Sequence, residues 1–82
     1  MQVSEVIKLA RQKTFLTQEE FSKKLGISLS SVIRWEKEKS VPNLSAMKKL
    51  KRFFDENQLS YEILEKARFG DNLSFDKLTK EK

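Results

Sequence analysis

The sequence predicts an all-α fold, a compact bundle of about five short helices forming one small domain. Apolar residues recur at helical spacing in separate stretches, as in Val6, Ile7 and Ala10. Capping residues, two glycines and a single proline stand between these stretches, where helices begin and end. With 82 residues, 38% of them apolar and 35% charged, the chain has enough apolar side chains for one modest core.

Composition argues against an enzyme, a metal site and a membrane protein. The chain has no cysteine and no histidine, which removes disulfides, thiolate zinc sites and the commonest general base. No paired carboxylates or activated nucleophile are visible, so we predict no catalytic residue, metal or cofactor. No apolar run approaches the roughly 18 residues that cross a bilayer, and no secretory signal pattern opens the chain. We therefore expect a non-enzymatic, cytoplasmic protein without membrane association.

Positive charge is concentrated in the first two thirds of the chain. Residues 1–54 hold 12 Lys/Arg and 5 Asp/Glu, a net charge of +7, whereas residues 55–82 hold 5 and 7, a net charge of −2. A basic region is the electrostatic footprint of nucleic-acid binding, although a solvated lysine-rich surface gives the same pattern.

The first helix is predicted within residues 1–14, with Ser4 as its N-cap. Leu9 falls off the apolar stripe of this helix, so we expect it to be partly exposed. The residues expected to face the core are Val3, Val6, Ile7 and Ala10.

Residues 17–36, TQEEFSKKLGISLSSVIRWE, predict two short helices around a tight turn. Thr17 and Glu20 have the spacing of a capping box. Gly26 suits the left-handed residue that ends a helix, and Ser28 suits the N-cap of the next one. Only three residues separate the two helices, which is the spacing of a helix-turn-helix.

The second of these helices is predicted at about residues 29–37, with Val32 and Trp35 facing the core. We interpret Trp35 as a core residue rather than a stacking platform for bases. Ile33 falls on the outer side or its margin, where it contacts a base methyl, forms a protein interface, or is simply an exposed apolar side chain. The other residues expected on the outer side or its margins are Leu29, Ser30 and Arg34.

A loop is predicted over residues 37–43, KEKSVPN, because Pro42 lacks a backbone N–H and stops the preceding segment. Asn43 can cap a fourth helix that reaches about Asp55. Of the adjacent Phe53 and Phe54, only one is expected to point fully inward, the other being an interface candidate. The apolar positions of this helix are Leu44, Met47, Leu50 and Phe54.

A fifth helix is predicted from a Ser60 cap to about Arg68, with Gly70 as its stop. After Gly70, only three apolar anchors remain, and Ser74 is a candidate cap for one last turn. The face of the fifth helix is expected to comprise Leu59, Ile63, Leu64 and Ala67, and the later anchors are Leu73, Phe75 and Leu78.

The region from about Val6 to about Phe54 resembles the helix-turn-helix of the phage-repressor/Cro (XRE) family. The resemblance implies a lambda-repressor-like DNA-binding domain at residues 1–68 and a C-terminal extension at residues 69–82. It implies a sequence-specific regulator of transcription, most simply a repressor, which binds double-stranded DNA as a homodimer. The matching residues are Thr17-Gln18, Phe21, Leu25-Gly26-Ile27-Ser28, Val32, Trp35-Glu36 and Pro42.

The resemblance also assigns roles to single residues. It places Leu29, Ser30 and Arg34 at base-reading positions in the major groove, with Ile33 as a further candidate. Arginine commonly makes a bidentate bond to guanine, and leucine can touch a thymine methyl. The residues it implies at DNA phosphates are Gln18, Ser28, Ser31, Lys37, Lys39, Ser40 and Asn43.

Five residues carry structural expectations from the resemblance. Arg11 and Glu36 are expected to form an ion pair between two helices, the alternative being two independent surface charges. Gln18 is expected to brace the start of the recognition helix. Phe15 stands where the family usually has glycine, so the turn after the first helix is a candidate for backbone strain. Glu38 stands where the family often has glycine. Glu38 also puts a negative charge near the expected phosphate track.

A second hypothesis is an antitoxin or another protein-interaction module. The acidic C-terminal part, with its three apolar anchors, would then bind a partner protein, because a short segment of this composition can fold on binding.

Overall fold

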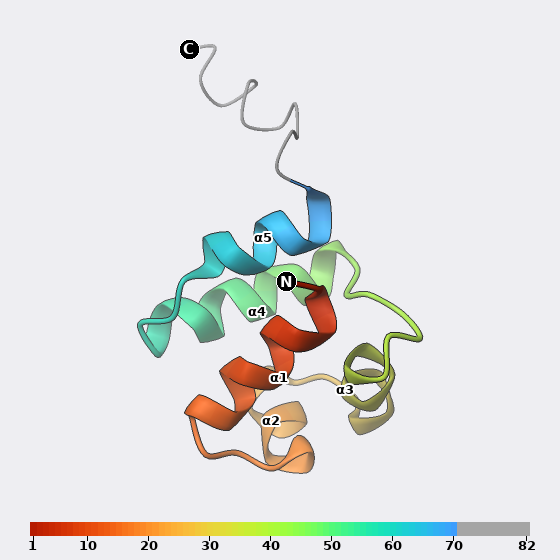
Figure 1. The fold of residues 1–82 in the computed structure, drawn as a ribbon. Coiled ribbons are helices and arrows are strands. Elements are labelled where there is room, and N and C mark those ends of the chain that lie inside the picture. The colour runs from red at the N-terminus through yellow and green to blue at the C-terminus, as the bar shows by residue number, and fades with distance from the viewer. Residues whose placement is uncertain (71–82) are drawn as a thin grey trace.

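The computed structural model describes residues 1–70, which form five helices and no strand. This confirms the predicted all-α fold class. Figure 1 shows α2 and α3 at one end of the molecule and α5 at the other, with α1 between them. The helices are α1 (Val3–Lys13), α2 (Gln18–Leu25), α3 (Leu29–Glu36), α4 (Leu44–Glu56) and α5 (Tyr61–Phe69).

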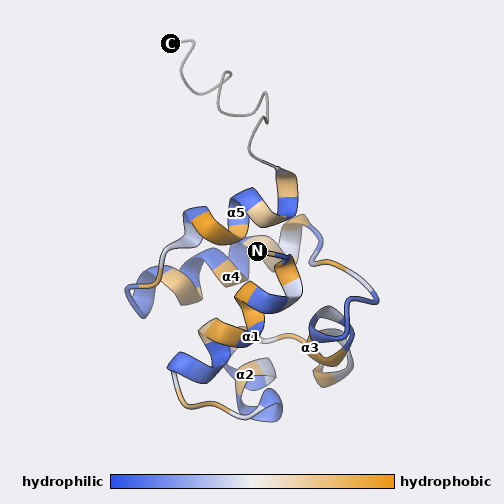
Figure 2. Ribbon diagram, in the orientation of Figure 1, coloured by the Kyte–Doolittle hydropathy of each residue, from blue (hydrophilic) through white to orange (hydrophobic). Residues whose placement is uncertain are grey.

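One apolar core holds the five helices together. α1 packs against α3 and α5, and α4 packs against α2 and α5. Each helix carries both hydrophobic and hydrophilic segments along its turns, as expected of short helices that bury a single face (Figure 2). The side chains that are wholly buried include Ile7, Phe21, Val32, Leu50 and Leu64, so all five helices contribute to the core.

Four of the five helices end in the same way. The C-cap of α2, and the residue after the C-cap in α1, α3 and α4, lies in the left-handed region. The N–H of the next residue donates to a carbonyl five residues back at 2.8–3.2 Å. This Schellman arrangement satisfies carbonyls that the helix itself leaves free. The left-handed residues are Phe15 (φ 60°), Gly26 (71°), Glu38 (62°) and Gln58 (59°). Of these four helix ends, only that of α2 has glycine at the left-handed position, where a side chain would be strained.

An apolar residue follows the left-handed one at three of these helix ends. Leu16, Ile27 and Leu59 are half-buried and pack against the core, and we call them the apolar latches. The end of α3 differs, because Lys39 occupies the latch position and is exposed.

The start of α1 corrects one prediction. Ser4 is not the N-cap: it lies inside α1 and is 6% exposed. Gln2 is the N-cap, and its backbone N–H donates to Glu5 Oε1 at 2.9 Å. Glu5 stands three residues after Gln2 and so satisfies an N–H that would otherwise lack a partner, which places the helix start two residues earlier.

Two predictions for α4 are wrong. Phe53 and Phe54 are both buried, because α4 lies between two neighbours and packs a ring against each. Phe53 contacts Phe21 of α2 edge to face, with ring centroids 5.1 Å apart, and Phe54 contacts Tyr61 of α5 at 6.2 Å. Leu44, predicted on the apolar stripe, is 69% exposed at the first turn of α4, where the helices of residues 1–70 leave most of its side chain uncovered.

The face of α5 is narrower than predicted. Leu64 is wholly buried, and Leu59 and Ala67 pack partly against the core, but Ile63 is 49% exposed. Ser60 occupies the N-cap position without a side-chain capping bond, and Gly70 is the C-cap, as predicted. The expectations for Leu73, Phe75, Leu78 and Ser74 lie outside the described residues.

The helix ends generate a stability prediction. Gln58→Gly is expected to raise the free energy of unfolding by about 0.5–1 kcal/mol, measured by urea denaturation. A left-handed backbone costs a residue with a side chain about 1–2 kcal/mol, and the entropy that glycine adds to the unfolded chain cancels part of this gain.

Gly26→Ala is the matched control and is expected to lower stability by about 1 kcal/mol. A methyl group at Gly26 would meet only Lys49 Nζ, at 3.9 Å, so the change tests the backbone angle rather than space. If both substitutions shifted stability in the same direction, strain at these helix ends would not explain either.

Candidate nucleic-acid interface

The orientation of α3 is fixed by its cap and by two buried residues. Ser28 is the N-cap, as predicted, and its Oγ accepts from the Ser31 N–H at 3.2 Å. Val32 and Trp35 are 0% and 4% exposed, so one side of α3 is locked into the core. The opposite side must therefore face outward.

The predicted base-reading residues share that outward side. Leu29 is 39% exposed, Ser30 and Arg34 are exposed, and Ile33 is half-buried at the margin. Hydroxyl groups gather at the first turn of α3, where Ser28 Oγ donates to Ser31 Oγ at 2.9 Å and lies 3.3 Å from Ser30 Oγ. The structure thus brings apolar, hydroxyl and guanidinium groups together on eight residues of helix.

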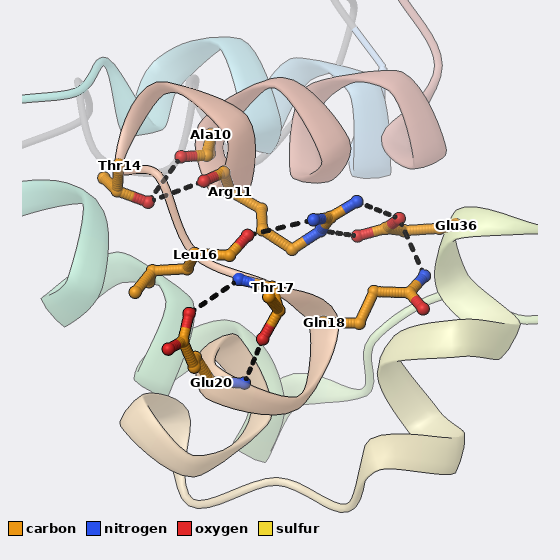
Figure 3. Close-up of polar contacts among 8 residues, drawn as sticks. All are labelled: Ala10, Arg11, Thr14, Leu16, Thr17, Gln18, Glu20 and Glu36. Atoms are coloured by element: carbon orange, nitrogen blue, oxygen red, sulfur yellow. Dashed lines mark hydrogen bonds and ion pairs between the residues drawn. The ribbon is translucent and has the colours of Figure 1, made fainter.

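An ion pair ties α1 to the end of α3 (Figure 3). Arg11 donates to both carboxylate oxygens of Glu36, from Nε to Oε2 at 2.7 Å and from a terminal nitrogen to Oε1 at 3.0 Å. Its other terminal nitrogen donates to the Leu16 carbonyl at 3.0 Å. The side chains are 14% and 5% exposed, and the hydrogen bond with Glu36 raises the pKa of Arg11 above its usual value despite desolvation. The guanidinium therefore keeps its charge throughout the ordinary pH range.

Gln18 joins the same network at its other side. Its Nε2 donates to Glu36 Oε1 at 3.0 Å, so the side chain braces the last residue of α3. The prediction that Gln18 braces the start of this helix is therefore wrong. Thr17 caps α2 through the predicted capping box, in which its Oγ1 accepts from the Glu20 N–H at 3.1 Å. An amide nitrogen has two hydrogens, so one N–H of Gln18 is left for a further acceptor.

The loop between α3 and α4 presents lysines on a supported backbone. Lys37 and Lys39 are exposed, whereas Ser40 is half-buried. Asn43 caps α4, as predicted, with its Oδ1 accepting from the Ala46 N–H at 2.8 Å, which leaves its amide nitrogen outside the cap. The loop is thus fixed at its two ends by the end of α3 and the cap of α4.

Two supporting contacts were not predicted. Lys49 Nζ donates to the Gly26 carbonyl at 3.1 Å, across the turn of the helix-turn-helix. Arg68 Nε donates to the Pro42 carbonyl at 2.9 Å, from α5 to the loop. Both join residues more than 20 positions apart. No local sequence pattern indicates which distant backbone carbonyl a lysine or an arginine will bond.

The charges around α3 leave its outer side positive. Arg34, Lys37 and Lys39 are exposed. Of the two acidic residues in this stretch, Glu36 is paired with Arg11, whereas Glu38 accepts from the neutral Ser4 Oγ at 3.3 Å and is outnumbered by the three cations. An anion approaching this surface would therefore meet donors and cations first.

No helix within residues 1–70 is both long and apolar enough to span a membrane. No group of three or more acidic, histidine or cysteine residues there is placed to hold a metal ion.

Two helices, a three-residue turn, and a buried face opposite an exposed one define a helix-turn-helix domain. Residues 7–61 match the model of one protein family, described as helix-turn-helix. The chain belongs to this family, and is of XRE/Cro type, which confirms the resemblance. The family is one of DNA-binding transcription regulators, typically without enzymatic activity, and membership supports binding to double-stranded DNA. Comparison with curated proteins and with solved structures gave no match.

The ion pair generates a second stability prediction. Arg11→Met is expected to lower the free energy of unfolding by about 3 kcal/mol in urea denaturation, because the Glu36 carboxylate stays buried with only Gln18 as a partner. Lys13→Met changes the same charge at an exposed position of α1 and is the control, expected within about 0.5 kcal/mol of the unchanged protein.

Adding Glu36→Met to Arg11→Met is expected to recover part of the loss, because the unpaired carboxylate is then removed as well. A double variant that loses the sum of both single losses would mean that the two charges act independently.

Proposed function

We propose that this protein is a transcriptional repressor that binds a specific operator as a homodimer. α3 lies in the major groove and α2 crosses the sugar-phosphate backbone, the arrangement in which helix-turn-helix proteins dock. The observation that carries this proposal is the exposed side of α3. Leu29, Ser30 and Arg34 project there from a helix whose other side, Val32 and Trp35, is locked into the core.

The proposed contacts divide into base-reading and phosphate-binding residues. Arg34 donates two hydrogen bonds to guanine O6 and N7, Leu29 packs on a thymine methyl, and Ser30 bonds a neighbouring base edge. Ile33, half-buried at the margin, extends the apolar contact. Phosphate contacts position the protein without reading sequence. The residues proposed for them are Gln18, Ser28, Ser31, Lys37, Lys39, Ser40 and Asn43.

The proposal of a homodimer follows from the size of the reading surface. α3 has only eight residues, so one copy reads a half-site of a few base pairs. Two copies related by two-fold symmetry would read a near-palindromic operator whose half-site centres lie about one helical turn apart. Repression requires only that the bound dimer cover the operator, whereas activation requires a further contact with the transcription machinery.

Selection of bound duplexes from a random library, followed by footprinting of the winner, tests this function. We expect a near-palindromic motif with a protected site. With about 6–10 phosphate contacts per dimer, affinity should fall by roughly 10³–10⁵ between 50 and 200 mM salt. Weak, salt-sensitive binding without an enriched motif would contradict sequence-specific recognition.

Two substitutions test the division between reading and positioning. Arg34→Ala is expected to cost about 1–3 kcal/mol of binding free energy and to relax the preference at one base position. Lys39→Ala is expected to weaken all sequences about equally and to lower the slope of log affinity against log salt by about 1. The readout is the selected motif of each variant together with its salt titration.

If the two variants changed the motif and the salt slope in the same way, the assignment of separate roles would be wrong. Lys8→Ala is a suitable control, because it removes an exposed lysine of α1 outside the proposed interface and should leave the motif unchanged.

A second candidate function is that of an antitoxin or other module that binds a protein partner. A groove of about 470 Å³ between α4 and α5 favours it, since apolar side chains dominate its lining. Leu44, Met47, Tyr61 and Phe69 contribute these side chains. The absence of any enriched DNA motif in the selection would favour this function over the first.

A further inference from the structure

The end of α3 lacks the apolar latch that holds the other helix ends. Leu16, Ile27 and Leu59 anchor the chain after α1, α2 and α4 against the core. The equivalent residue after α3 is Lys39, which is exposed. Burying a lysine there would be unfavourable, because its charged amino group would lose its hydration. Further along, the loop is anchored by the buried side chain of Pro42 and by the bond from Arg68 to the Pro42 carbonyl. Residues 38 and 39, directly after α3, need another attachment.

Glu38 supplies a different attachment, to the first turn of α1. Ser4 Oγ donates to Glu38 Oε2 at 3.3 Å, and Ser4 is 6% exposed. The side-chain amide nitrogen of Gln2, when turned toward this carboxylate, lies 2.9 Å from Oε2 and 3.1 Å from Oε1. We call these contacts of Glu38 with Ser4 and Gln2 the α1–loop bridge.

Neither backbone strain nor charge explains a glutamate at this position. Its φ of 62° is a conformation that glycine adopts without penalty. Its negative charge stands one residue from Lys37 and Lys39, which are proposed to contact phosphates. On both grounds glycine would serve better at position 38, so the contribution of Glu38 must come from the contacts its carboxylate makes.

We propose that Glu38 is a positioning residue for DNA binding. Through the α1–loop bridge it takes the place of the missing latch, and it holds the backbone at Lys37 and Lys39 so that both lysines stay exposed toward the phosphates. The inference rests on the proposed DNA-binding function, because it explains how the phosphate-contacting loop of that site is held.

A pair of substitutions at Glu38 separates positioning from charge. Glu38→Gly and Glu38→Gln both remove the negative charge, but only glutamine keeps an oxygen that accepts from Ser4. We expect Glu38→Gly to weaken binding to the selected operator by about threefold to tenfold, the range that one or two lost hydrogen bonds correspond to. Glu38→Gln is expected to bind as tightly as the unchanged protein or more tightly. Equal or tighter binding by Glu38→Gly would overturn the inference.

Ser4→Ala removes the Ser4 contact of the bridge without changing charge or the backbone at position 38, and it leaves the Gln2 contact in place. It is expected to weaken operator binding, by no more than Glu38→Gly does, and to have no further effect when combined with Glu38→Gly. Gln58→Gly is the matched control, because it places glycine at the same point of a Schellman motif far from the loop. Its operator affinity should equal that of the unchanged protein, and an equal loss there would assign the effect to glycine itself.

A measurement without DNA keeps the inference separate from the proposed function. The N–H of Lys39 donates to the Arg34 carbonyl at 2.9 Å, and hydrogen exchange reports how often this bond opens. We expect Ser4→Ala to speed exchange of the Lys39 amide while that of the Leu59 amide, at the end of α4, is unchanged. Unchanged Lys39 exchange would overturn the bridge, whereas failure of the unchanged protein to select any DNA would overturn the proposed function alone.

Discussion

The contact on which the rest of this structure depends is the bond between Arg11 and Glu36. A buried carboxylate is costly unless its oxygens are bonded, and here Arg11 and Gln18 supply the donors. One guanidinium thereby joins α1, the turn before α2, and the last residue of α3. The end of α3 cannot shift without breaking charge-assisted bonds on two sides. The exposed side of α3 is therefore presented at a fixed orientation relative to the N-terminus of α2.

The ends of the helices solve a second constraint, which is how to turn a short chain four times within a small volume. Each of the first four helices turns with one left-handed residue, and three of those residues carry a side chain. Apolar latches bury a neighbouring side chain at three of the turns, and at two of these, after Phe15 and Gln58, the burial offsets the strain of a left-handed residue with a side chain. At the end of α3 a latch would take Lys39 away from solvent, and polar contacts from Glu38 to α1 occupy its place. The exception lies beside the proposed DNA surface, where exposed cations are needed.

Much of this arrangement could be predicted from the sequence. The cap at Thr17, the left-handed Gly26 and the buried pair Val32 and Trp35 are local signals, and the structure contains each of them. The errors about burial share a cause. Leu44 and Ile63 fit an apolar period, but within residues 1–70 their neighbouring helices cover them only in part. Phe53 departs from the period but has Phe21 beside it. Periodicity gives the direction of a side chain, while burial depends on what packs against that direction.

By itself, the sequence determined the number and order of the helices, the turn between α2 and α3, and the outward side of α3. These features follow from caps, glycine and apolar spacing, which act within a few residues. Only the tertiary structure decided which distant polar groups bond one another: Gln18 with the last residue of α3, Lys49 with the turn carbonyl, and Glu38 with Ser4 of α1. The physical reason is range, because these hydrogen bonds join atoms that packing of the core brings within about 3 Å although 18 to 34 residues separate them along the chain.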